Sequence, residues 1–112
     1  MGKGANLGEF EEIVLLAVAR LDGDGHGAAI HAEILHATGR DVSIPAVYVT
    51  LSRLEEKGYV VTGVELSGPD RSGRARKTFA LTDSAVVELQ NARRVQARLW
   101  EGLDFDPLTA GE

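Results

Sequence analysis

The chain has 112 residues, of which 44% are hydrophobic and none is cysteine. This length suits one domain with its own core. The lack of cysteine excludes disulfides, thiolate nucleophiles and cysteine-based zinc sites. No stretch approaches the roughly 18 apolar residues of a membrane span, and the first residues lack the apolar run of a signal peptide. We therefore expect a soluble, cytoplasmic protein with no membrane partner.

Charge is unevenly distributed along the sequence. The formal net charge of −5 argues against a protein that coats nucleic acid without selectivity. Residues 40–80, however, hold seven cations and five anions, a balance of +2, whereas the rest of the chain holds five cations and twelve anions, a balance of −7. The pattern predicts a locally positive segment on an acidic body, which would suppress indiscriminate binding to phosphates.

The first half of the chain predicts three short helices. Apolar residues at helical spacing indicate an amphipathic helix from about Gly8 to Leu21, followed by a glycine-rich turn over residues 22–27. A second helix is expected from about Gly27 to Thr38, with Gly39 as its C-terminal cap. A third helix is expected between Ser43, a good N-terminal cap, and Gly58.

The second half predicts a hairpin and a long last helix. Two β-type runs, Tyr59 to Leu66 and Thr78 to Leu81, are separated by a loop rich in turn residues. Thr82 and Asp83 suit the N-terminal cap of a helix that runs to about Gly102. Four cations with no acidic residue among them stand at the end of the hairpin loop: Arg71, Arg74, Arg76 and Lys77.

Three helices and a basic hairpin are the layout of a winged helix-turn-helix. The predicted fold is therefore mainly α with a small β-hairpin. We expect a winged helix-turn-helix DNA-binding domain at residues 1–82 and a C-terminal dimerisation helix with a tail at residues 83–112. The expected partners are double-stranded DNA and a second copy of the chain, with no cofactor, no metal and no catalytic activity.

The third helix is the candidate recognition helix. Val47, Leu51 and Leu54 form its expected inward stripe, which leaves positions 45, 46, 49, 52 and 53 facing outward. Small apolar groups near its start suit thymine methyls, and hydroxyls suit phosphate oxygens. The candidate DNA contacts on this helix and its cap are Ser43, Pro45, Ala46, Tyr48, Val49, Thr50 and Arg53. The alternatives are ordinary helix packing for Tyr48 and a solvated charged loop for the hairpin cations.

The last helix carries a long apolar stripe. A helix of this length exceeds what a small three-helix core covers, and exposed apolar stripes usually meet a partner. The predicted dimer interface comprises Val86, Leu89, Ala92, Val95, Leu99, Trp100 and Leu103. The alternatives are a helix folded back on its own domain and, for Trp100, part of a pocket for a small-molecule effector.

Several short motifs together resemble the PadR family of bacterial transcriptional regulators. They occur in the family's order and spacing and include Leu7-Gly-Glu-Phe-Glu11, Ala46-Val47-Tyr48, Arg53-Leu54-Glu55, Lys57-Gly58 and Leu81-Thr82. The resemblance implies a homodimer with winged helix-turn-helix heads, usually a repressor on operator DNA, of the subgroup with a single C-terminal helix. It also implies DNA contacts by Tyr48, Thr50 and Arg53 on the recognition helix and by Arg74 on the wing.

Other functions fit the residues less well. Asp22, Asp24, Gly27 and Glu33 match positions of a calcium loop, but His26 occupies a position that needs an oxygen ligand. The three histidines are spaced by five, so no pair shares a helical face as zinc requires, and we expect them to face solvent or cap helices. No catalytic constellation stands out. The main alternative to DNA binding is a winged-helix module for protein–protein contact.

Overall fold

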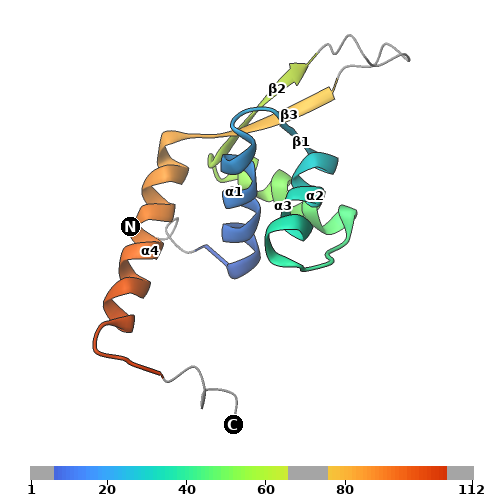
Figure 1. Cartoon of the computed structure of the whole chain (residues 1–112). Coiled ribbons are helices and arrows are strands. Elements are labelled where there is room, and N and C mark those ends of the chain that lie inside the picture. Colours follow the sequence, from blue (N-terminus) through green and yellow to red (C-terminus); the bar gives the residue numbers. More distant parts are fainter. Residues whose placement is uncertain (1–6, 66–75, 106–112) are drawn as a thin grey trace.

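The computed structural model describes residues 7–65 and 76–105. In Figure 1, α1, α2 and α3 form a body beneath the strands, and α4 runs down one side. Within these residues no helix is long and apolar enough to cross a membrane. The elements are α1 (Glu9–Leu21), β1 (Gly25–His26), α2 (Gly27–Thr38), α3 (Ile44–Glu56), β2 (Val60–Glu65), β3 (Arg76–Leu81) and α4 (Asp83–Trp100).

Capping residues set the helix ends that the sequence predicts. The Ser43 hydroxyl accepts the Ala46 N–H at 3.1 Å, and the Thr82 hydroxyl accepts the Ala85 N–H at 3.2 Å, so each caps the helix that follows it. Gly39 has a φ of 76° and ends α2 in the left-handed conformation that favours glycine. The predicted starts of α3 and α4 and the predicted end of α2 are confirmed.

The sheet has three strands rather than the two predicted. Its order is β1-β3-β2, with both pairs antiparallel. β2 and β3 form the expected hairpin, in which Val60 lies opposite Leu81. The prediction of a plain turn over residues 22–27 was wrong, because Gly25 and His26 pair with Phe79 and Thr78 of β3. A two-residue strand has no alternation of its own in the sequence, so its pairing with the distant β3 is not marked locally.

The core lies where the three helices meet the sheet. The predicted inward stripe of α3 is confirmed, since Val47, Leu51 and Leu54 are at most 1% exposed. α4 contributes little, because Ala85 is its only buried residue. Among the residues that the structure describes, the other buried apolar ones are Val14, Leu15, Ala17, Val18, Ile30, Ile34, Tyr59, Val60 and Phe79.

A buried carboxylate joins the start of α1 to the end of α3. Glu11 is 7% exposed, and its side chain accepts the Gly8 N–H at 3.0 Å and the Lys57 ammonium at 2.8 Å. Burial raises the pKa of Glu11, but the hydrogen bonds from Lys57 and Gly8 outweigh burial and hold the pKa below its usual value. Glu11 therefore fixes the body helices while it is ionised.

This ion pair predicts an acid-dependent loss of stability. Because the folded pKa of Glu11 is below its ordinary value of 4.5, its contribution is complete above that value and is lost as the pH falls through the folded pKa. Since the Lys57 side chain is 36% exposed, we expect Glu11→Gln to cost only about 1–2 kcal/mol at pH 7. Urea unfolding at pH 7 and in acid should show this cost shrinking as the pH falls.

Glu9→Gln is the matched control, because the Glu9 side chain is 80% exposed and pairs with Arg40 at 3.4 Å. An exposed pair contributes little, so this variant should unfold like the unmodified protein at every pH. A cost for Glu11→Gln that stays constant from neutral to acid pH would contradict the assignment.

Candidate nucleic-acid interface

α3 presents a continuous surface on the side away from the core. Tyr48 is 46% exposed and Val49 56%, and Ile44 at the start of the helix is 44% exposed. Pro45 and Arg53 are also exposed, as is Ser52 between them. The outward positions of the helix therefore match the prediction, apart from Ala46, which is half-buried. The first turn of this surface is apolar, and its hydrogen-bonding groups lie further along the helix.

Two of the predicted contact residues are less available to DNA than expected, one because it is buried and one because its hydroxyl caps α3. Thr50 is only 5% exposed, because it stands three residues after Val47 and four before Leu54 and so shares their inward face. Its hydroxyl is not on the outward surface. Ser43 is exposed, but its hydroxyl already accepts the Ala46 N–H as the cap of α3. We leave Thr50 out of the proposed interface.

The turn between α2 and α3 is held by a histidine that sequence reasoning missed. The Val42 carbonyl lies 2.6 Å from Nε2 of His31 on α2, and since a carbonyl only accepts, Nε2 carries the proton and donates. The Arg40 N–H is accepted by the Thr38 hydroxyl at 3.0 Å. These bonds fix the segment that leads into Ser43 and hence the start of α3. No short-range signal marks His31, because its partner lies eleven residues away.

The described part of the wing is positively charged where β3 begins. Arg76 and Lys77 begin β3, and both side chains are exposed. Lys77 lies 3.9 Å from a Glu55 carboxylate oxygen and 5.9 Å from the centroid of the Phe79 ring. Arg71 and Arg74, the other two predicted contacts, lie outside the described residues.

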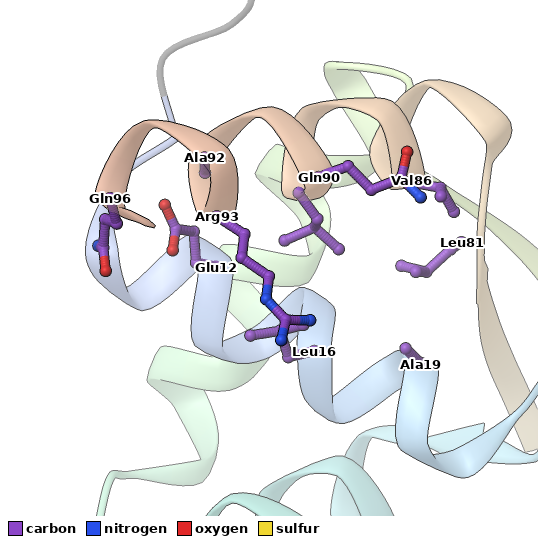
Figure 2. A pocket seen from close by; sticks show the side chains of 10 residues that line it. Glu12, Leu16, Ala19, Leu81, Val86, Gln90, Ala92, Arg93 and Gln96 are labelled. Atoms are coloured by element: carbon purple, nitrogen blue, oxygen red, sulfur yellow. The ribbon is translucent and has the colours of Figure 1, made fainter. Parts of the chain in front are cut away.

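The α4 stripe is largely uncovered in the single chain. Val95 is 57% exposed and Leu99 70%, and Leu103, just beyond the end of the helix, is 51% exposed. The alternative in which α4 folds back on its own domain therefore fails for the far half of the helix. Near its start, α4 and α1 border a groove of about 540 Å³, and Figure 2 shows Leu16 and Val86 on its walls. Leu89 and Ala92 of the stripe also line this groove.

Trp100 lies at the end of α4 and is 57% exposed. Its ring meets Phe105 edge-on, with 5.9 Å between the centroids. Trp100 is not among the residues that line the groove between α1 and α4. The two aromatic rings extend the apolar stripe beyond the last turn of the helix.

The calcium alternative does not match the local geometry. Glu33, which would supply the last ligand, lies within α2 and forms an ion pair with Arg20. Among residues 7–65 and 76–105, no group of three or more His, Asp or Glu side chains is arranged to hold a metal ion.

The sequence profile of the transcriptional regulator PadR-like family matches residues 15–91. The chain belongs to this family. The matched stretch extends from the middle of α1 through the helix-turn-helix and the wing into α4. The protein is therefore a DNA-binding transcriptional regulator with a winged-helix fold. No curated protein sequence matches the chain significantly.

Solved structures of similar fold include members of the same family. A PadR family transcriptional regulator from Eggerthella lenta has a TM-score of 0.65 at 22% identity, covering 85% of this chain and 82% of that one. A PadR-like regulator from Bacillus cereus has a TM-score of 0.66 at 17% identity, covering 80% and 82%. RosR of H. salinarum has a TM-score of 0.67 at 20% identity, covering 88% and 82%. At these identities the similarity establishes the fold.

Proposed function

We propose that this PadR-like protein is a repressor that binds a pseudo-palindromic operator as a homodimer. The observation that carries the proposal is the outward surface of α3, which is exposed along its length while the opposite face is buried. A helix enters the major groove side-on, so one exposed face on a rigid support is what base reading needs. Repression follows when the bound dimer covers a promoter.

The proposed interface combines α3 with the wing. Tyr48 is placed to donate its hydroxyl to a phosphate oxygen, and Arg53 is placed to contact a base edge or a phosphate. On the wing, Arg76 and Lys77 supply charge to the backbone or the minor groove, together with Arg71 and Arg74. The acidic remainder of the chain limits binding to sites where both α3 and the wing fit.

We further propose that α4 is the dimerisation element. Its apolar stripe is exposed in the single chain, and the groove between α1 and α4 is lined largely by apolar side chains. A second copy of α4 supplies the complementary apolar surface for both. Two heads related by a twofold axis then require half-sites about one helical turn, or a multiple of it, apart.

Selection of binding duplexes from a random pool tests the proposal. The purified protein should enrich a pseudo-palindrome, and the complex should contain two chains for each duplex. A pool that shows no enrichment after several rounds would instead favour the protein-contact alternative, and capture of a protein partner would come next.

Base reading by the start of α3 should depend on thymine methyl groups. Pro45 and Val49 expose apolar surface there and offer no hydrogen bond, and a methyl group is the apolar mark of thymine. Replacing the thymidines of a selected half-site by deoxyuridine should weaken binding about fourfold for each contacted methyl. Val49→Ala should reduce that loss.

The same replacement between or outside the half-sites is the control and should leave affinity unchanged. Equal affinity for the methylated and unmethylated half-sites would remove thymine methyl recognition from the proposed interface and leave the phosphate contacts.

A small-molecule effector near Trp100 remains a further proposal. Trp100 is the single tryptophan of the chain, and it is exposed beside Phe105 at the end of the proposed dimerisation helix. Its fluorescence should be quenched by a planar ligand held between subunits, and titration with candidate compounds checks this.

The proposed cytoplasmic location follows from the DNA partner.

A further inference from the structure

A tyrosine ring occupies the space where the side chain of Gly27 would stand. Gly27 is the first residue of α2 and is buried. A Cβ built on it would overlap the Cζ, Cε1 and hydroxyl oxygen of Tyr48, all closer than 3.0 Å. When a Cβ is built on the other glycines in the described part of the chain, the shortest distance to a neighbouring atom is 3.0 Å, between Leu21 and the Cβ on Gly25. The contact between Gly27 and Tyr48 is therefore unusually close.

The backbone at Gly27 does not itself require glycine. Gly27 is not among the residues with positive φ, unlike Gly39 and Gly58. Alanine favours a helix more than glycine does, so helix formation alone would prefer alanine at this position. The Tyr48 ring supplies the physical reason for glycine, because any side chain would occupy its place.

The position of the Tyr48 ring is linked to the wing through Gly27 and β1. Gly27 directly follows β1, whose two residues pair with Phe79 and Thr78 of β3. A ring held against Gly27 is therefore held relative to both α3, from which it extends, and the strand that carries the wing cations.

Tyr48 is partly open to solvent. The residue is 46% exposed, and among the described residues its hydroxyl makes no hydrogen bond to protein. A ring fixed on one side loses less freedom when its hydroxyl binds a ligand than a ring that turns freely. The close contact thus orients a hydroxyl that has no competing partner in the described part of the chain.

We propose that Gly27 is a positioning residue for DNA binding: its missing side chain seats the Tyr48 ring and so aims the hydroxyl at the DNA backbone. This inference rests on the proposed function, because it takes Tyr48 as a DNA contact. With Gly27→Ala, the ring must rotate away from α2. The backbone can remain in place, since the overlapping atoms are at the end of a side chain that can turn.

A double-mutant cycle on a selected duplex tests the proposal. Tyr48→Ala should weaken binding roughly tenfold through loss of a hydrogen bond to a charged group. Gly27→Ala should weaken it to a similar extent, and it should have no further effect in the Tyr48→Ala background. Thermal unfolding should show that all three variants fold. Additive losses, or a Gly27→Ala variant that binds as the unmodified protein does, would overturn the proposal.

Gly8→Ala is the matched control. Gly8 is the N-cap residue of α1, also at negative φ, and the nearest side-chain atom to a Cβ built there is 3.9 Å away. This variant should bind the duplex normally. A loss equal to that of Gly27→Ala would assign the effect to helix starts in general and overturn the role of the ring.

The possible failures are distinguishable. If the unmodified protein enriches no duplex, the proposed function fails and the inference fails with it. If Tyr48→Ala binds as well as the unmodified protein, Tyr48 is not a DNA contact, and the inference alone is overturned. An NMR spectrum of the free protein tests the seat without DNA, because ring currents should shift the Gly27 Hα protons upfield. Tyr48→Ala should abolish this shift. If the unmodified protein shows no such shift, the Tyr48 ring does not lie against Gly27 and the proposal is overturned.

Discussion

Leu99→Asp should convert the proposed dimer into a folded monomer. Leu99 is 70% exposed in the single chain and stands in the apolar stripe of α4. In a dimer each chain would bury an unpaired carboxylate, at about 3–5 kcal/mol a chain. The fold should survive, since Leu99 takes no part in the core. Light scattering at micromolar concentration should give the mass of one chain. Operator affinity should fall because the dimer is lost.

Val87→Asp is the matched control for this prediction. Val87 is 52% exposed on the same helix but lies on the other side of α4 from the stripe. The Val87→Asp variant gains the same charge, but outside the proposed interface. It should therefore keep the mass of two chains. A dimer that survives Leu99→Asp would show that α4 does not form the interface.

Removing the cations at the base of the wing should weaken DNA binding with little dependence on sequence. Arg76→Ala with Lys77→Ala removes two exposed charges from each chain, and so up to four phosphate contacts from a dimer. At physiological salt the affinity should fall roughly tenfold to hundredfold. The slope of log affinity against log salt should decrease by about 0.9 for each lost phosphate contact. Anisotropy titrations over a salt series measure both quantities.

Arg20→Ala with Arg94→Ala provides the control for charge alone. Arg20 pairs with Glu33, and Arg94 bonds to Asn91 on the side of α4 away from the stripe. The same change in net charge should leave the slope unchanged. A wing variant with an unaltered slope would exclude these two cations from the interface.

Local chemistry explains why most of the fold was predictable. The ends of α2, α3 and α4 depend on Gly39, Ser43 and Thr82, which act within a few residues of their own position. The inward stripe of α3 follows from helical spacing in the same way. β1 depends on pairing with residues more than fifty positions later, and no local pattern encodes such a pairing.

The candidate site was predictable in outline but not in its contacts. Thr50 was named as a DNA contact because of its hydroxyl, whereas its spacing from Val47 and Leu54 places it inside. A polar residue at an inward position gives mixed signals, and only packing decides between them. The His31 bond to Val42 and the seat of Tyr48 on Gly27 join different elements, so the sequence gives no sign of either.

Fluorescence anisotropy on duplex DNA from upstream of the protein's own gene would test sequence-specific recognition most directly. The comparison is with a scrambled duplex of the same composition, over a series of salt concentrations. We expect the upstream duplex to bind about a thousandfold more tightly, with affinity falling as salt rises. Equal affinity for both duplexes, or no binding to either at low salt, would contradict the proposal that α3 and the wing read an operator at this gene.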